Sequence, residues 1–284
     1  MKQPTLIIEA GRSEKNYWLD LWRYRELFLI LAWRDISVRY KQTFVGVSWA
    51  LLQPFLQIVV FTLVFSWLLN TPSEGDAPYA IMAFAAMLPW QFFATALTNS
   101  SQSVVGSSNL ISKVYFPRLI VPCASMVVCL IDFLIASLIF GLLALWYQFL
   151  PDWRILTLPF FLLVAFLAAL GPGLLIAAMN VRYRDFRYVL PFIIQFGLYA
   201  SAVPISLSLI REKLLALPYG EHLYQLYCLN PMVGVIDGFR WALLGGESQL
   251  YWPGFCISLA AILIMLWVGI HFFRKTERTF ADII

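Results

Sequence analysis

Charged residues are scarce in this sequence. Asp, Glu, Lys and Arg make up 13% of its 284 residues, whereas apolar residues make up 61%. Ordinary soluble domains carry about 25% charged residues. One soluble core could not bury this much apolar surface, so the composition excludes an ordinary soluble domain and favours a protein that lipid covers.

A phosphate-binding loop is also missing. The chain contains no Gly-Lys dipeptide and therefore no G-x-x-x-x-G-K-[ST] motif, in which backbone amides and a lysine hold nucleotide phosphates. If the protein's activity is driven by nucleotide hydrolysis, a separate subunit must bind the nucleotide.

Cysteine and histidine are too few and too dispersed to suggest a metal centre or a proton relay. Cys123, Cys129, Cys228 and Cys256 lie in or beside apolar stretches without the spacing of metal ligands, which is typical of buried, inert thiols. The two histidines stand alone. We expect no metal and no cofactor in this chain.

Long apolar runs are what the sequence has instead. A membrane-spanning helix needs about 20 apolar residues, because the hydrocarbon layer is about 30 Å thick and a helix rises about 1.5 Å per residue. Backbone amides in lipid must be satisfied within their own segment, so such runs indicate helices. The sequence predicts an all-α polytopic membrane protein with six transmembrane helices, at Val47–Leu69, Ala77–Thr98, Leu119–Leu150, Ile155–Val181, Val189–Ile210 and Tyr251–Phe273.

Basic residues are unevenly divided between the two sets of alternate loops. If the N-terminus is inside, 16 of the 20 Lys and Arg fall on the cytoplasmic side, where such residues are normally in excess. We therefore expect both termini in the cytoplasm, with a cytoplasmic segment 1–46, a transmembrane domain 47–273 and a cytoplasmic tail 274–284. Attraction to anionic membrane lipid and the orientation of the protein in the membrane explain the excess of Lys and Arg on the cytoplasmic side. We therefore do not expect nucleic acid as a partner.

The segment before the first run has the pattern of an interfacial helix. Tyr17–Trp33 is apolar and aromatic over much of its surface, with charged residues recurring near one side, which predicts a helix lying along the membrane. Its basic continuation, Arg34–Gln42, leads into the first run. This segment either anchors to lipid headgroups or docks a cytoplasmic partner.

Asp132 is the only Asp, Glu, Lys or Arg inside the six runs. An ionisable residue at such depth is costly and marks a candidate functional site. Because we expect no second charge nearby, a structural hydrogen bond to a neighbouring helix is the alternative. A further alternative is that the protein is a secondary transporter that couples transport to an ion gradient through Asp132.

The segment 211–250 is too polar and too often broken by Pro and Gly to span the membrane. It predicts re-entrant or interfacial helices on the outer side. Irregular backbone at membrane depth is tolerated where protein or water surrounds it. This segment therefore either lines a transport pathway or forms a capping loop without a role in transport.

Two of the runs carry aromatic and amide side chains at helical spacing. Such faces suit sugars, which offer C–H faces to rings and hydroxyls to amides, although ordinary helix packing explains single aromatic stripes equally well. The candidate substrate-path residues are Gln53, Gln57, Phe61, Phe65, Phe192, Gln195, Phe196 and Tyr199.

Five segments, in order along nearly the whole chain, resemble the polysaccharide and polyol-phosphate export permeases of the type-2 ABC transporter family. The pattern is most similar to O-antigen exporters, with capsule and teichoic-acid exporters as near neighbours. The segments are Leu31–Phe65, Leu88–Pro122, Asn180–Phe192, Asn230–Gly245 and the C-terminal FRKTERTFADII.

The resemblance implies the permease subunit of an ATP-driven exporter that moves a lipid-linked polysaccharide across the inner membrane. It implies pairing with a second copy of the chain and with two copies of an ATPase, which would hold the ATP and Mg²⁺. The family's interface helix would fall on Leu19–Trp33, and segment 211–250 would form the outer gate. A polytopic transferase acting on a lipid-linked sugar is the alternative from another class.

The resemblance also places ATPase contacts on the two cytoplasmic loops. Short basic and aromatic loops can form ion pairs and packing contacts with a partner. A simple cytoplasmic turn that follows the positive-inside rule would have the same composition. The candidate coupling residues are Lys113, Tyr115, Arg118, Arg182, Tyr183, Arg184, Asp185, Phe186 and Arg187.

Overall fold

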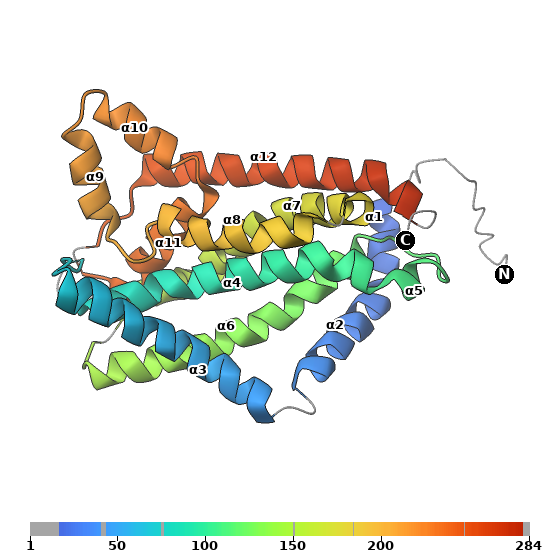
Figure 1. Cartoon of the computed structure of the whole chain (residues 1–284), viewed down its shortest axis with the longest axis horizontal. Helices are drawn as coiled ribbons and strands as arrows, with labels where there is room; N and C mark the ends of the chain where they lie inside the picture. Colours follow the sequence, from blue (N-terminus) through green and yellow to red (C-terminus); the bar gives the residue numbers. More distant parts are fainter. Residues whose placement is uncertain are drawn as a thin grey trace.

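The chain folds into an elongated helical bundle. A computed structural model describes residues 17–40, 44–74, 77–149, 151–183, 185–246 and 248–280, and for residues 44–51 it describes the backbone alone (Figure 1). Helix accounts for 82% of the described residues, and these ranges contain no strand. The predicted all-α class is confirmed.

The helices form three groups. Two N-terminal helices come first, α1 (Tyr17–Arg23) and α2 (Arg25–Tyr40). Long helices build the bundle: α3 (Phe44–Phe61) with its π-helical continuation η1 (Thr62–Leu68), α4 (Tyr79–Gly106), α6 (Ile120–Trp146), α7 (Leu158–Arg182) after the 3₁₀ turn η2 (Trp153–Thr157), α8 (Phe186–Ala200), and α12 (Trp252–Thr276) with the 3₁₀ turn η3 (Glu277–Thr279). Short helices lie at the connections: α5 (Ser108–Ile111), α9 (Leu207–Leu215), α10 (Gly220–Tyr227) and α11 (Pro231–Leu244).

The predicted apolar runs correspond to these long helices. Within the described parts, four helical stretches are long and apolar enough to cross a membrane: Tyr79–Gly106, Ile120–Trp146, Trp153–Arg182 and Trp252–Thr279. Two shorter apolar helices, Leu52–Leu68 and Phe186–Ala200, match the first and fifth runs. The bundle has one end marked by α1, α5 and η3, here called the α5 end, and an opposite end marked by α9 and α10, here called the α10 end (Figure 1).

The fifth predicted run differs most from the structure. It was expected to continue to Ile210, but α8 ends at Ala200 and a turn leads into α9. Ala202 adopts a positive φ of 58°, and Pro204 has no N–H to continue a helix. Ser206 then caps α9 by accepting a hydrogen bond from the Leu209 amide at 3.4 Å. Local turn chemistry therefore interrupts an otherwise apolar stretch.

The core of the bundle is built around α4. Every residue from Tyr79 to Trp90 is buried, and α4 packs mainly against α6 and α7. The four alanines among these residues allow close approach of the neighbouring helices, as small side chains do at helix contacts in membranes. Phe84 packs edge-to-face against Phe140 of α6, with ring centroids 5.8 Å apart. The helix thus holds the other spans at fixed positions.

Two glycines set the contact between α7 and α12. A Cβ atom added at Gly269 would lie 2.1 Å from the carbonyl oxygen of Gly171, and one added at Gly171 would lie 2.7 Å from the backbone nitrogen of Leu266. No real side chain tolerates such distances. The two backbones touch here, and only glycine fits at these positions.

The expected interfacial helix is two helices. The predicted unit Tyr17–Trp33 is divided at Tyr24 into α1 and α2, and α2 continues to Tyr40. The second helix, α2, packs against α6 and slants along it towards the start of α3 (Figure 1). Trp18, Trp22 and Trp33 remain exposed, so the N-terminal pair keeps an aromatic outer surface while its other side contacts the bundle.

Candidate functional site

The α5 end gathers segments that are distant in sequence. The side chain of Asn180, near the end of α7, donates to the carbonyl oxygen of Ser101 in α4 at 2.9 Å. This contact places the loops that follow α4 and α7 at the same end of the bundle. The predicted coupling residues of both loops therefore lie on one side of the molecule.

The N-terminal helix and the C-terminal turn join this end. The hydroxyl of Tyr17 donates to Glu277 Oε2 at 3.0 Å, and the guanidinium of Arg274 lies 4.4 Å from the centre of the Tyr17 ring. Burial and the Glu277 carboxylate raise the pKa of the Tyr17 phenol, so it keeps the proton that it donates. Arg118 of the first loop lies 5.9 Å from the ring centre of Phe280. The C-terminal part of the described chain thus contacts both the N-terminal helix and the first loop.

Most of the predicted coupling residues are exposed. Lys113 and Tyr115 project from the first loop, whereas Arg118 is half-buried. In the second loop Arg182, Tyr183, Asp185 and Arg187 are exposed and Phe186 is half-buried; Arg184 lies outside the described residues. Arg182 stacks on Tyr183 at 5.5 Å, and Arg187 stacks on Tyr188 at 5.2 Å. The loops present a basic, aromatic surface that is suited to a protein partner.

The aromatic face of α8 points away from the bundle. Leu190 is the buried residue of this helix, and Gly197 packs against the Trp90 ring of α4. On the other side Phe192 is 62% exposed, Phe196 73% and Tyr199 57%, with Gln195 also exposed. These side chains share a face that is free to contact lipid, a second chain or a passing ligand.

The corresponding residues of α3 and η1 are more enclosed. Gln53, Gln57, Phe61 and Phe65 are half-buried, and the two phenylalanine rings meet edge-to-face with centroids 5.7 Å apart. No hydrogen bond reaches Gln57 Oε1 from the described part of the chain, although it is buried. Because α4 separates α3 from α8 (Figure 1), the two sets of predicted path residues do not form one cluster within a single chain.

Asp132 is held by the end of α2. Arg39 Nη2 lies 2.8 Å from Asp132 Oδ2, and the Tyr40 hydroxyl donates to Asp132 Oδ1. Asp132 lies twelve residues beyond Ile120, or about 18 Å along α6. The assumption that no second charge lies near Asp132 was therefore wrong. Its partners, Arg39 and Tyr40, lie more than 90 residues earlier in the chain, shortly before the first run.

Segment 211–250 folds into α9, α10 and α11 at the α10 end. Of these, α11 is almost wholly buried and inserts among α4, α7 and α12. The Asn230 side chain caps α11 by accepting from the Met232 amide at 3.1 Å and donates to Ser201 Oγ at 2.9 Å. The short helices are thereby tied to the turn that follows α8.

Arg240 of α11 is a residue whose role the sequence did not reveal. It is 0% exposed, and its guanidinium donates to the carbonyl oxygens of Ala202, Val203 and Ile205 at 3.0 to 3.1 Å. Glu74 and Asp237 provide the opposite charges that act on it. The sequence did contain one indication of this role: Arg240 follows Asp237 by three residues within an apolar helix. Arg240 fastens α11 to the turn between α8 and α9.

Comparison with known proteins matches this architecture to one family. Residues 26–244 match the ABC-2 type transporter domain. The chain is 25% identical over 264 residues to the O-antigen export system permease protein RfbA of Myxococcus xanthus, covering 93% of this chain and 97% of that protein. It is 22% identical over 269 residues to RfbA of Klebsiella pneumoniae, covering 91% and 95%. The polysialic acid transport protein KpsM of Escherichia coli is 22% identical over 254 residues, covering 86% and 91%.

The family match has direct consequences for location and energy supply. Permeases of this family sit in the inner membrane, and they lack nucleotide-binding motifs of their own. The family implies an ATPase partner and a polysaccharide substrate. From its match over residues 26–244 and its bundle of apolar helices, we conclude that the chain belongs to the ABC-2 type transporter family.

Proposed function

We propose that this chain is the transmembrane permease of an ATP-driven exporter that moves lipid-linked O-antigen from the cytoplasmic to the outer side of the inner membrane. The observation that carries the proposal is the match to O-antigen export permeases over more than nine-tenths of both chains. Similarity to KpsM makes a capsular polysaccharide the second candidate cargo.

The proposed topology has six crossings with both termini in the cytoplasm. The four long apolar helices and the two shorter ones supply the crossings. The distribution of Lys and Arg supports assigning the α5 end to the cytoplasm. The α10 end, with α9, α10 and α11, then faces the outer side as a gate.

The energy comes from two copies of a separate ATPase, which hold ATP and Mg²⁺. The exposed loop residues of the α5 end, including Lys113, Tyr115 and Arg187, form the docking surface. Movement of the ATPases reaches the spans through these loops, and the permease itself performs no covalent chemistry.

The path is proposed to lie between two copies of the chain. The exposed face of α8 and the half-buried amides of α3 flank α4 in one chain, so a second copy is needed to close a channel around them. Phe196 and Tyr199 would stack on sugar rings while Gln195 bonds to hydroxyls. Weak contacts repeated along the path let a polymer slide.

Export from cells that lack the gene tests the proposal. Complementation with this chain and its ATPase should restore surface glycan, and an ATPase variant unable to hydrolyse ATP should not. Conversion of a lipid-linked sugar by the purified permease without any ATPase would favour a membrane transferase. Export that continues without ATP but is abolished by Asp132→Asn would favour ion-coupled transport.

A further inference from the structure

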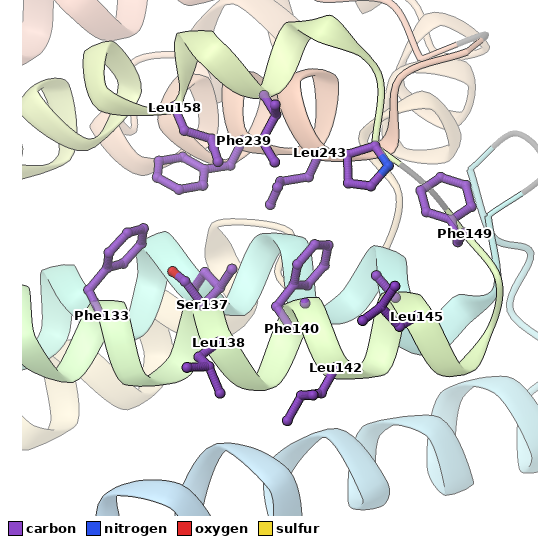
Figure 2. A pocket seen from close by; sticks show the side chains of 15 residues that line it. Phe133, Ser137, Leu138, Phe140, Leu142, Leu145, Phe149, Leu158, Phe239 and Leu243 are labelled. Atoms are coloured by element: carbon purple, nitrogen blue, oxygen red, sulfur yellow. The ribbon is translucent and has the colours of Figure 1, made fainter.

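An apolar cavity of about 480 Å³ lies near the α10 end, between α6, η2 and α11. Figure 2 shows Phe133 and Phe140 of α6 on one side, and Phe239 and Leu243 of α11 on the other. The cavity is open on one side, because Leu138, Leu142 and Leu145 of its lining are exposed. Binding sites for small molecules occupy about 300–1,000 Å³. The volume is that of a ligand site.

The cavity exists because one face of α6 carries small side chains. Ser137, Gly141 and Ala144 line it at spacings of four and three residues, which places them on one helical face. A Cβ atom added at Gly141 would meet nothing within 4 Å. The space beside Gly141 is thus open, and no neighbouring side chain fills it.

The inner wall of the cavity is aromatic and rigid. Phe133, Phe140 and Phe239 are buried. Phe133 meets Phe239 edge-to-face with centroids 5.9 Å apart, and Phe140 meets Phe84 at 5.8 Å. These rings cannot turn into the space without losing their own packing, so the cavity persists unless a ligand occupies it.

The chemistry of the lining selects hydrocarbon. Ser137 is the single lining residue with a polar side chain among the described residues, and no lining residue is charged. Water needs several polar partners and leaves an apolar cavity dry. A sugar or a phosphate would lose its hydrogen bonds there. An aliphatic chain has no hydrogen bonds to lose and gains van der Waals contacts with the lining.

The position of the cavity brings it next to lipid chains. Trp146, 83% exposed, follows the lining residue Leu145, and Trp153, 67% exposed, precedes the lining residue Ile155. Exposed tryptophans at the ends of spanning helices mark the level of the headgroups. The lining residues that extend from there along α6 therefore lie at the depth of acyl chains.

We propose that this cavity binds one acyl chain of a phospholipid from the leaflet at the α10 end. The bulk lipid, and not the tail of the cargo, is the occupant because neither α8 nor α3 contributes a lining residue. A chain seated there contacts α6 and α11 together, through Ser137 and Gly141 on one side and Phe239 and Leu243 on the other. It therefore holds α11 in its place among the spans.

Photolabelling tests the site directly. The full-length permease, in complex with its ATPase, is placed in vesicles of phosphatidylethanolamine and phosphatidylglycerol with a trace of phosphatidylethanolamine carrying a diazirine midway along one acyl chain. Adducts should concentrate on peptides containing Ser137–Leu145 and Ile155–Leu158. Gly141→Phe should remove them, because its ring fills the open space, while adducts on α12 stay unchanged as an internal reference.

Matched variants and a competitor decide the outcome. Leu134→Phe adds a ring to the lipid-facing side of α6, where residue 134 does not line the cavity, and should leave the labelling intact. Ser137→Phe provides a second filling variant if Gly141→Phe does not fold. Labelling that is even over all lipid-facing helices, that is absent from the cavity, or that survives both filling variants would overturn the proposal. Displacement of the adducts by excess polyprenyl phosphate would also overturn it, in favour of the cargo tail.

Discussion

The guanidinium of Arg39 lies 2.8 Å from the carboxylate of Asp132, and this ion pair joins the end of α2 to the middle of α6. Tyr40 donates to the same carboxylate, and burial together with that neighbour raises the pKa of the Tyr40 phenol, which keeps it protonated. The charge of Asp132 is therefore compensated by an adjacent helix, and α2 is fixed where the first span begins.

Replacing Asp132 with Asn should loosen α2. Removing one partner of a fully buried ion pair costs about 3–5 kcal/mol, and the partial exposure of Arg39 reduces the expected loss to about 1–3 kcal/mol. Thermal unfolding in detergent and proteolysis within α2 measure the change. Asp35→Asn breaks the more exposed Arg34–Asp35 pair and should have little effect. A double variant with Arg39→Gln should lose less than the sum of the two single losses, and strict additivity would rule out the coupling.

Replacing Arg240 with Met should release the turn after α8. Three carbonyl oxygens lose their charged donor, and unpaired buried polar groups cost about 1–3 kcal/mol each. We expect faster proteolysis between residues 200 and 230 and reduced glycan export. Arg211→Met is the matched control, since Arg211 is exposed and stacks on Tyr251 at 4.4 Å. Equal protease resistance of both variants would show that Arg240 does not fasten α11.

Replacing both Phe196 and Tyr199 with Ala should reduce surface glycan while the amount of permease in the membrane stays the same. The two rings are mainly exposed, so their loss removes contacts to cargo or to a second copy without opening the core. Immunoblots of the membrane fraction and gel analysis of surface glycan measure the two quantities. Ile264→Ala on α12, also exposed, serves as the control. Unchanged glycan would remove the α8 face from the proposed path.

Reversing the charge of Arg187 should weaken copurification of the ATPase. The side chain is exposed at the α5 end, where an acidic partner surface would be repelled by Glu. Retention of the ATPase on tagged permease, measured against salt concentration, gives the effect. Lys213→Glu makes the same charge change on α9 at the α10 end and should not alter retention. Equal retention by both variants would refute the docking assignment.

Replacing Gly269 with Leu should destabilise the contact between α7 and α12. The new side chain would meet the Gly171 carbonyl oxygen, and overpacking costs about 1–3 kcal/mol or more. The unfolding midpoint should fall. Gly106→Leu adds the same atoms in open space at the end of α4 and should leave the midpoint near that of the wild type. A similar midpoint for both variants would mean that α7 and α12 can separate at low cost.

Much of the fold could be predicted because apolar runs of spanning length have few alternatives in a bilayer. The second, third, fourth and sixth runs became α4, α6, α7 and α12 nearly as expected. The break after Ala200 could not be predicted in the same way, because it depends on one positive φ, a proline and a serine cap within an apolar stretch. Hydropathy averages over such local features.

The sequence by itself determined the helical membrane class, the division of charge between the loops and the family resemblance, since each follows from composition and local pattern. Only the tertiary structure decided that Arg39 meets Asp132, that Arg240 holds the turn after α8, and that Ser137 and Gly141 leave an apolar cavity beside α11. These relationships join residues far apart in the chain. They depend on how helices approach and rotate against one another, which the pattern within any single helix does not specify.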